Sequence, residues 1–181
     1  MKKLRFFSML CLLALIIGFF AGCKKDEVNN NGNDNVNGGS GGSGGALAGY
    51  VDLGLPSGTK WKASNEIGNG SGFYTFDEAV STFGSQLPTK EQFEELTIYC
   101  TWTWQNIGSY RITGQNGNFI VLPAAGYREP DCIYNVGSSG NYWSSTTGDS
   151  ECGWGLGFDS GNVIMFNGLR FFGFAVRLVK D

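Results

Sequence analysis

Few residues of this sequence are of the types that commonly carry out chemistry in proteins. None of its 181 residues is a histidine, which excludes Ser-His-Asp triads, Cys-His dyads and histidine-ligated metal sites. Glu129 and Asp131 flank a proline and place carboxylates on one turn, but calcium takes about six to eight oxygen ligands. We therefore expect an ordinary acidic turn there, with no metal site and no cofactor.

The cysteines are the other reactive residues. Cys11 and Cys23 belong to the N-terminal segment, so Cys100, Cys132 and Cys152 remain for the folded part. Cys100 follows the apolar side of a predicted helix, where a cysteine is usually a small buried residue. In an oxidising compartment Cys132 and Cys152 could pair with each other or remain reduced.

The first 22 residues have the pattern of an export signal. Three positive charges precede residues 6–20, an apolar run shorter than the about 20 residues that span a bilayer. Residues 21–23 (AGC) resemble the lipobox of bacterial lipoproteins, which implies that residues 1–22 are removed and that Cys23 is lipidated. An ordinary signal peptide with an incidental cysteine is the alternative, but the tether that follows favours an anchor.

The residues after Cys23 predict the location of the protein. Lys25, Asp26 and Glu27 resemble the surface-export signal of lipoproteins from the Bacteroidetes, which implies an outer-membrane protein that faces the cell exterior. A short solvated charge cluster is the alternative. Residues 28–45 are almost wholly Asn, Gly, Ser and Asp, which cannot bury enough apolar surface to fold. Residues 23–46 are therefore predicted to be a lipid-anchored flexible tether.

The charge of the chain excludes one class of partner. Without Lys2, Lys3 and Arg5 it has 10 basic residues against 16 acidic ones, a net charge of −6. A protein that binds nucleic acid needs a basic surface to neutralise phosphates. We therefore expect no nucleic-acid partner.

Residues 47–181 are predicted to form one folded domain. Capping boxes at Thr75 with Glu78 and at Thr89 with Gln92 each predict the start of a one-sided helix. Helices that precede a series of short strands and tight turns are typical of an α+β domain. The expected strands are residues 110–113, 119–122, 141–145, 153–158, 163–166 and 174–179.

Five segments of this domain resemble, in order, the Fibrobacter-type major paralogous domain of Bacteroidetes lipoproteins. They are YVDLGLPSGTKW at 50–61, LPTKEQFEEL at 87–96, LPAAGYR at 122–128, YWSST at 142–146 and GFAVRLV at 173–179. The resemblance implies a C-type-lectin-like fold with two helices, a small antiparallel sheet with hairpins, and chain ends close together. Lectin-like describes the fold and does not establish sugar binding.

The most informative region is residues 150–172. Trp154, Leu156 and Phe158 alternate toward one face of a strand, as core residues do, whereas the other face carries only glycine. The following run, 164–172, has neither strand nor helix periodicity, so some of its apolar side chains must point outward. Such side chains either form a binding surface or complete the core.

The same region resembles the variable proteins of diversity-generating retroelements. These proteins keep a pattern like that of residues 154–158 and 173–179 and diversify positions between them to create new binding surfaces. The resemblance implies a ligand-binding face in which apolar anchors lie among glycine and polar residues. The predicted ligand-binding residues are Gly155, Gly157, Asp159, Met165, Phe166, Asn167, Leu169, Phe171 and Phe172.

The sequence therefore favours a surface-displayed lipoprotein, not an enzyme, that binds an extracellular protein or glycan through its C-terminal face. A structural or tip subunit of a surface appendage is the main alternative. A second alternative is an oxidase similar to the formylglycine-generating enzymes, which share the lectin-like fold and use a cysteine pair. That resemblance would assign the pair to Cys132 and Cys152.

Overall fold

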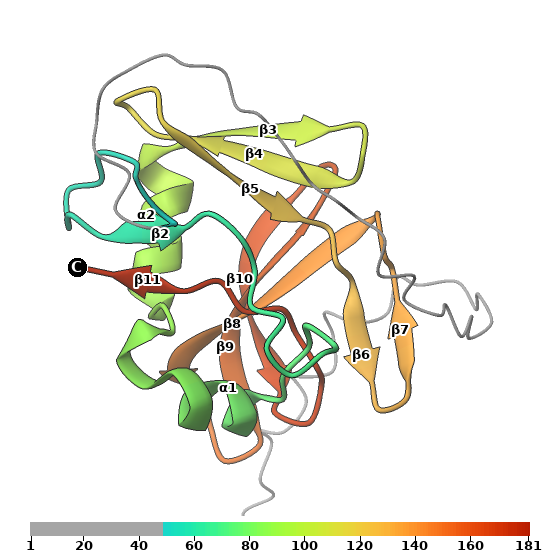
Figure 1. Cartoon of the computed structure of the whole chain (residues 1–181). Helices are drawn as coiled ribbons and strands as arrows, with labels where there is room; N and C mark the ends of the chain where they lie inside the picture. Colours follow the sequence, from blue (N-terminus) through green and yellow to red (C-terminus); the bar gives the residue numbers. More distant parts are fainter. Residues whose placement is uncertain (1–48) are drawn as a thin grey trace, which may run out of the picture.

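A computed structural model describes residues 49–181 of the chain (Figure 1). The predicted signal peptide, the lipidation site Cys23 and the tether lie outside the described residues, and so do the first two residues of the predicted domain. The division of the chain at residues 22/23 and 46/47 therefore stays a prediction.

Two short α-helices begin at the two predicted capping boxes. The Thr75 hydroxyl accepts a hydrogen bond from the Glu78 amide, and the Glu78 carboxylate accepts one from the Thr75 amide, at the start of α1 (Phe76–Phe83). Thr89 and Gln92 make the same reciprocal pair before α2 (Lys90–Tyr99), and the 3-10 turn η1 (Gly84–Gln86) joins the helices. In residues 49–181 no helix is long and apolar enough to cross a membrane.

The other elements are antiparallel strands in four small sheets, which confirms the predicted α+β class. Both β1 and β11 pair with β2, so the start and the end of the described residues share one sheet. In strand order, the sheets are β1 (Tyr50–Asp52), β2 (Lys60–Lys62) and β11 (Val179–Lys180); β3 (Thr101–Gln105), β4 (Ser109–Thr113) and β5 (Phe119–Pro123); β10 (Val163–Leu169), β9 (Cys152–Asp159) and β8 (Ser139–Thr147); and β6 (Tyr127–Glu129) with β7 (Cys132–Tyr134).

The structure has five short strands that were not predicted, β1, β2, β3, β6 and β7, and the last predicted strand, residues 174–179, is mostly absent. Only Val179 continues into a strand, β11. Phe174 and Ala175 instead make single bridges to Tyr74 and Tyr142, which belong to different parts of the fold. The segment is apolar and extended because it runs through the buried centre between these elements. In the sequence, an extended buried segment of this kind has the same pattern as a strand that pairs in a sheet.

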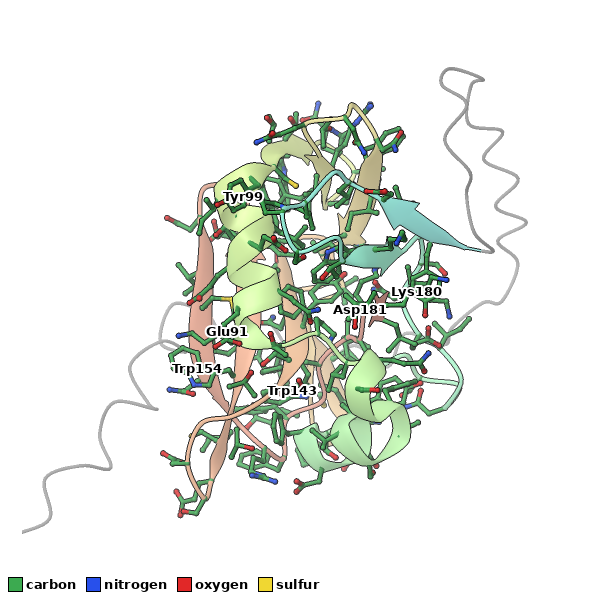
Figure 2. The ribbon with its side chains drawn as sticks, turned by 90° about the vertical axis from the view of Figure 1, so that its left-hand side faces the viewer. Glu91, Tyr99, Trp143, Trp154, Lys180 and Asp181 are labelled. Atoms are coloured by element: carbon green, nitrogen blue, oxygen red, sulfur yellow. The ribbon has the colours of Figure 1, made fainter. Side chains whose placement is uncertain are left out.

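The core lies on both faces of the β8–β9–β10 sheet. Tyr142 and Trp143 are neighbours on β8, so their side chains point to opposite faces, and both are fully buried. Tyr142 packs in one cluster with Leu156 and Phe158, under α2, which crosses this sheet in Figure 2. Trp143 packs in a second cluster, where its ring centroid lies 4.1 Å from that of Phe174. The predicted core positions Leu156 and Phe158 are thus confirmed.

A buried arginine connects three of the sheets. Arg177 is 1% exposed, and its guanidinium donates hydrogen bonds to the carbonyl oxygens of Lys62 in β2 (2.9 Å) and Val121 in β5 (2.7 Å). The guanidinium also lies near the Tyr142 hydroxyl of β8. Burial of the guanidinium lowers its pKa. Because a guanidinium has five donors in a fixed plane, one side chain can bond carbonyls from separate sheets.

Candidate functional site

The predicted binding residues lie along the hairpin formed by β9 and β10. The Asp159 carboxylate accepts hydrogen bonds from the amides of Gly161 (2.8 Å) and Asn162 (2.9 Å), which closes the turn between the two strands. The register pairs Phe166 with Gly155. Since paired residues project to the same face, this register decides which predicted residues share a surface.

One face of the hairpin is core, and it includes a residue predicted to bind ligand. Met165 pairs with Leu156 and packs against the core cluster beneath α2, so the prediction that it anchors a ligand is not supported by its position. Trp154, predicted to be core, is only partly buried, and the ammonium of Lys90 lies 4.1 Å from its ring centre. Asn167 pairs with Trp154 and is also partly buried.

On the other face, the glycines are covered and do not form an open surface. Gly155 and Gly157 are both buried, and the ring of Phe166 lies over them. A Cβ atom added at Gly157 would lie 3.1 Å from Cε1 of Phe166, and one at Gly155 would lie 3.4 Å from it. The two glycines therefore provide the space in which this half-buried ring packs, and Ile164, which pairs with Gly157, is the exposed side chain of this face.

Phe171 and Phe172 differ, although both were predicted to be exposed. Phe171 is 56% exposed, whereas Phe172 is 5% exposed and stacks on Phe174 with centroids 6.1 Å apart. The Phe172 amide donates to the Leu169 carbonyl, so the chain turns here, and the two rings lie in contact, with Phe172 on the core side and Phe171 on the solvent side. The prediction for Phe172 was wrong, because a turn following β10 carries one ring outward and the next into the core.

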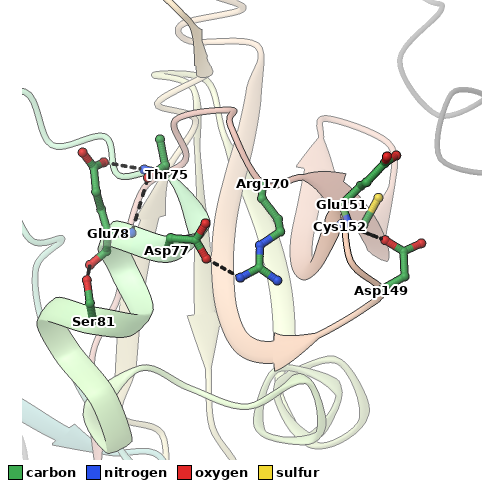
Figure 3. A network of polar contacts seen from close by, with 8 residues as sticks. All are labelled: Thr75, Asp77, Glu78, Ser81, Asp149, Glu151, Cys152 and Arg170. Atoms are coloured by element: carbon green, nitrogen blue, oxygen red, sulfur yellow. Dashed lines mark hydrogen bonds and ion pairs between the residues drawn. The ribbon is translucent and has the colours of Figure 1, made fainter.

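Phe171 and Leu169 line an open groove of about 710 Å³. Its lining residues come from three separate segments: the start of α1, the loop between β8 and β9, and the end of β10 with the turn after it. Figure 3 shows Asp77, Glu151 and Arg170 from these segments. The remaining lining residues are Thr75, Asp77, Ser150, Glu151 and Arg170. The sequence does not indicate the first four of these as binding residues, since nothing local shows that three distant segments meet.

Arg170 fixes the geometry of this groove. Its side chain forms an ion pair with Asp77 and lies 4.7 Å from the ring centre of Phe76. Its main chain bonds both neighbouring segments, since its amide donates to the Glu151 carbonyl and its carbonyl accepts from the Phe76 amide, each at 2.9 Å. Asp159 lies at the opposite end of the hairpin and takes no part in this groove.

The cysteines are placed as follows. Cys132 and Cys152 are both disulfide-bonded, and their pairing with each other stays a prediction. Cys100 is a free thiol at the end of α2, half-buried against the core. Burial, together with the nearby Glu95 carboxylate, raises its pKa to about 11. The thiol is therefore protonated at neutral pH and a poor nucleophile.

Removal of metal ions is expected to leave the protein's Tm unchanged. Glu129 and Asp131 lie at the turn between β6 and β7, and residues 49–181 contain no group of three or more His, Cys, Asp or Glu side chains able to hold a metal ion. A thermal melt of the purified protein with EDTA tests this. A Tm lowered by EDTA and restored by calcium would contradict it, because a bound ion stabilises the folded state.

Residues 97–179 match the model of a family described as a domain of unknown function (DUF8237). The match begins near the end of α2, so it contains the β8–β9–β10 sheet and the groove residues from Leu169 to Phe171, but not α1. No curated protein and no solved structure matches the chain. All predicted ligand-binding residues lie inside the matched region.

Proposed function

We propose that this chain is a surface-displayed bacterial lipoprotein whose folded domain binds an extracellular protein or glycan without catalysis. In this proposal Cys23 carries the lipid, residues 24–46 form the tether, and the domain presents its C-terminal face to the exterior of the cell. The binding face contains Phe171 and Leu169, with the half-buried Phe166 beyond them.

The fold supports the resemblance on which part of this proposal depends. A C-type-lectin-like fold has two helices, small antiparallel sheets and neighbouring chain ends, and the described residues have two short α-helices, four antiparallel sheets, and β1 and β11 on either side of β2. We propose that the domain has this fold and belongs with the Fibrobacter-type major paralogous domains. Diversification by a retroelement rests on the sequence resemblance alone. The positions of Gly155, Gly157 and Phe172 do not support it, because these residues are buried and cannot contact a ligand directly.

The observation that carries the binding proposal is the exposed ring of Phe171 beside the groove. A large apolar side chain that is 56% exposed loses water on binding, and exposed rings pack against both apolar side chains and the C–H faces of sugars. The polar groups around it are held in place by their own contacts, Arg170 by Asp77 and Thr75 by Glu78. Such an arrangement, an apolar anchor within a fixed polar rim, is typical of binding hot spots.

Binding is tested with a printed glycan array and a phage-displayed peptide library as probes. We expect ligands selected on the wild-type protein to lose binding to Phe171→Ala but to keep binding to Phe119→Ala. Phe119 is a matched control because it is 44% exposed and lies in β5, in a different sheet. Ligands that bind both variants equally, or the absence of any ligand in both screens, would contradict the proposed face.

The Cys23→Ser variant is expected to leave the membrane fraction. Each buried CH₂ of an acyl chain contributes about 0.8 kcal/mol to membrane binding, so a chain without lipid has no comparable anchor. Fractionation of cells followed by immunoblotting measures the effect. Retention of Cys23→Ser in the membrane, at the level of a Ser43→Ala control in the tether, would refute anchoring through this residue.

A further inference from the structure

The charges that line the groove do not balance. Asp77, Glu151 and Arg170 are its charged lining residues, and Asp149 lies two residues before Glu151 in the same loop. Arg170 is already engaged, because its guanidinium forms an ion pair with Asp77 and lies over the ring of Phe76. Figure 3 shows this guanidinium directed toward Asp77, whereas Glu151 belongs to a different segment. The one cation of the lining is therefore not available to neutralise the loop between β8 and β9.

The carboxylates of Asp149 and Glu151 have no ion-pair partner within residues 49–181. Both side chains are exposed, and the only hydrogen bonds that the Asp149 carboxylate accepts in this part of the chain come from the amides of Glu151 and Cys152, each at 2.8 Å. The surrounding sequence supplies no cation either, since residues 129–169 contain five acidic residues and no Lys, Arg or His. The loop therefore presents uncompensated negative charge at the rim of the groove.

The main chain holds Glu151 beside the exposed ring of Phe171. The Glu151 amide donates to Asp149, and the Glu151 carbonyl accepts from the Arg170 amide at 2.9 Å. Phe171 follows Arg170 directly, and both Glu151 and Phe171 line the groove. A ligand that covers the Phe171 ring therefore displaces water from Glu151 as well. Removal of water from an ionised carboxylate is costly unless a positive group pairs with it.

We propose that the ligand of the groove is a protein segment that presents a Lys or Arg side chain next to an apolar one. This inference rests on the proposed function and names the chemistry of its partner. The apolar side chain packs on Phe171 and Leu169, and the cation pairs with Glu151, where the charge of Asp149 adds to the attraction. The aliphatic stem of Lys or Arg can lie along the Phe171 ring while its charged end meets the carboxylate. A neutral glycan would leave Glu151 without water and without a partner, and an acidic glycan would be repelled.

An array of synthetic peptides tests this chemistry directly. Each peptide has one apolar residue, varied among Phe, Leu and Trp, followed by Lys, Arg, Gln or Glu, within an otherwise Gly-Ser sequence. We expect the full chain to bind Lys and Arg peptides about tenfold more tightly than Gln peptides with the same apolar residue, and Glu peptides least. An increase of the salt concentration from about 0.05 M to about 0.5 M should reduce this difference, because salt screens exposed charges.

Two variants of Glu151 show whether its carboxylate makes this distinction. Glu151→Gln should remove the preference for Lys and Arg peptides, and Glu151→Lys should reverse it, so that Glu peptides bind best. Glu91→Gln is the matched control and should retain the preference, because Glu91 is an exposed carboxylate of α2 outside the groove lining. The Glu151 side chain is exposed, so each variant should keep the Tm of the wild type, which checks that it is folded.

The outcomes separate this inference from the proposed function. Peptides that lose binding to Phe171→Ala but show no preference for a cation would overturn the inference and still support the proposed binding face. A neutral or acidic glycan that binds through Phe171, with no peptide bound, would have the same meaning. Lys and Arg peptides that bind Phe171→Ala and Glu151→Gln as tightly as wild type would contradict both, and so would the absence of any bound peptide or glycan.

Discussion

Replacement of Phe172 by alanine is expected to lower the free energy of unfolding by about 3–5 kcal/mol, and the same change at Phe171 by no more than about 0.5 kcal/mol. The two rings are neighbours in the sequence, with centroids 4.6 Å apart, but only Phe172 is buried. It stacks on Phe174 and meets the edge of Tyr127, so its loss leaves a cavity between β6 and the second core cluster.

Thermal or urea unfolding of the two variants measures this difference. For a domain of this size we expect Phe172→Ala to lower Tm by about 10 °C or more. Phe119→Ala is the control for an exposed ring and should behave like Phe171→Ala. If Phe171→Ala unfolded as readily as Phe172→Ala, the Phe171 ring would be part of the core, and the proposed binding face would lose its anchor.

Local signals in the sequence predicted the two helix starts and the strands β4, β5, β8, β9 and β10, but not β1, β2, β3, β6 and β7. Capping boxes at Thr75 and Thr89 give helix starts because the motif satisfies its hydrogen bonds within four residues. The predicted strands 110–113 and 119–122 correspond to β4 and β5, which pair with each other across the turn around Gly117. In these cases the interactions that decide the structure lie close together in the sequence.

The burial of residues 164–172 depends on contacts that are distant in the sequence. The absence of periodicity correctly indicated that some apolar side chains are exposed, as Ile164 and Phe171 are. It could not show which ones, because that depends on the turn after Leu169 and on partners such as Tyr127 and Phe174. The glycines of β9 were similarly ambiguous, since a glycine face can be open surface or, as here, the place where Phe166 packs.

The groove could not be predicted at all. Asp77 and Arg170 are 93 residues apart, and Glu151 comes from a third segment. Each of these residues looks like an ordinary solvated charge in the sequence. Only the fold brings them together around Phe171.

Replacement of Arg177 by alanine is expected to destabilise the domain by about 3–5 kcal/mol, a large part of the about 5–15 kcal/mol typical of a domain. The buried guanidinium is the donor for carbonyl oxygens of Lys62 and Val121. A hydrogen bond to a charged group contributes about 1.5–3 kcal/mol net, and alanine removes two of them. It also removes the packing of the aliphatic stem.

The cost of burying the charge acts in the opposite direction. Burial lowers the pKa of Arg177, which shows that the protein environment disfavours the charged form, and a well-packed apolar side chain can sometimes replace a buried charge without loss. Arg177→Met tests which effect is larger, because methionine keeps most of the stem but donates no hydrogen bond. We expect about half of the alanine loss to remain, since the two carbonyls would stay buried without this donor.

Urea unfolding of wild type, Arg177→Ala, Arg177→Met and Arg177→Lys separates these contributions. Lysine keeps a charge but has a single ammonium, which cannot reach carbonyls on β2 and β5 together, so we expect it to be no more stable than methionine. If Arg177→Met were as stable as wild type, the guanidinium would contribute only packing. If Arg177→Lys were as stable as wild type, a positive charge alone would be enough for stability at this position. The hydrogen bonds of the planar guanidinium to β2 and β5 would then not explain why this position holds arginine.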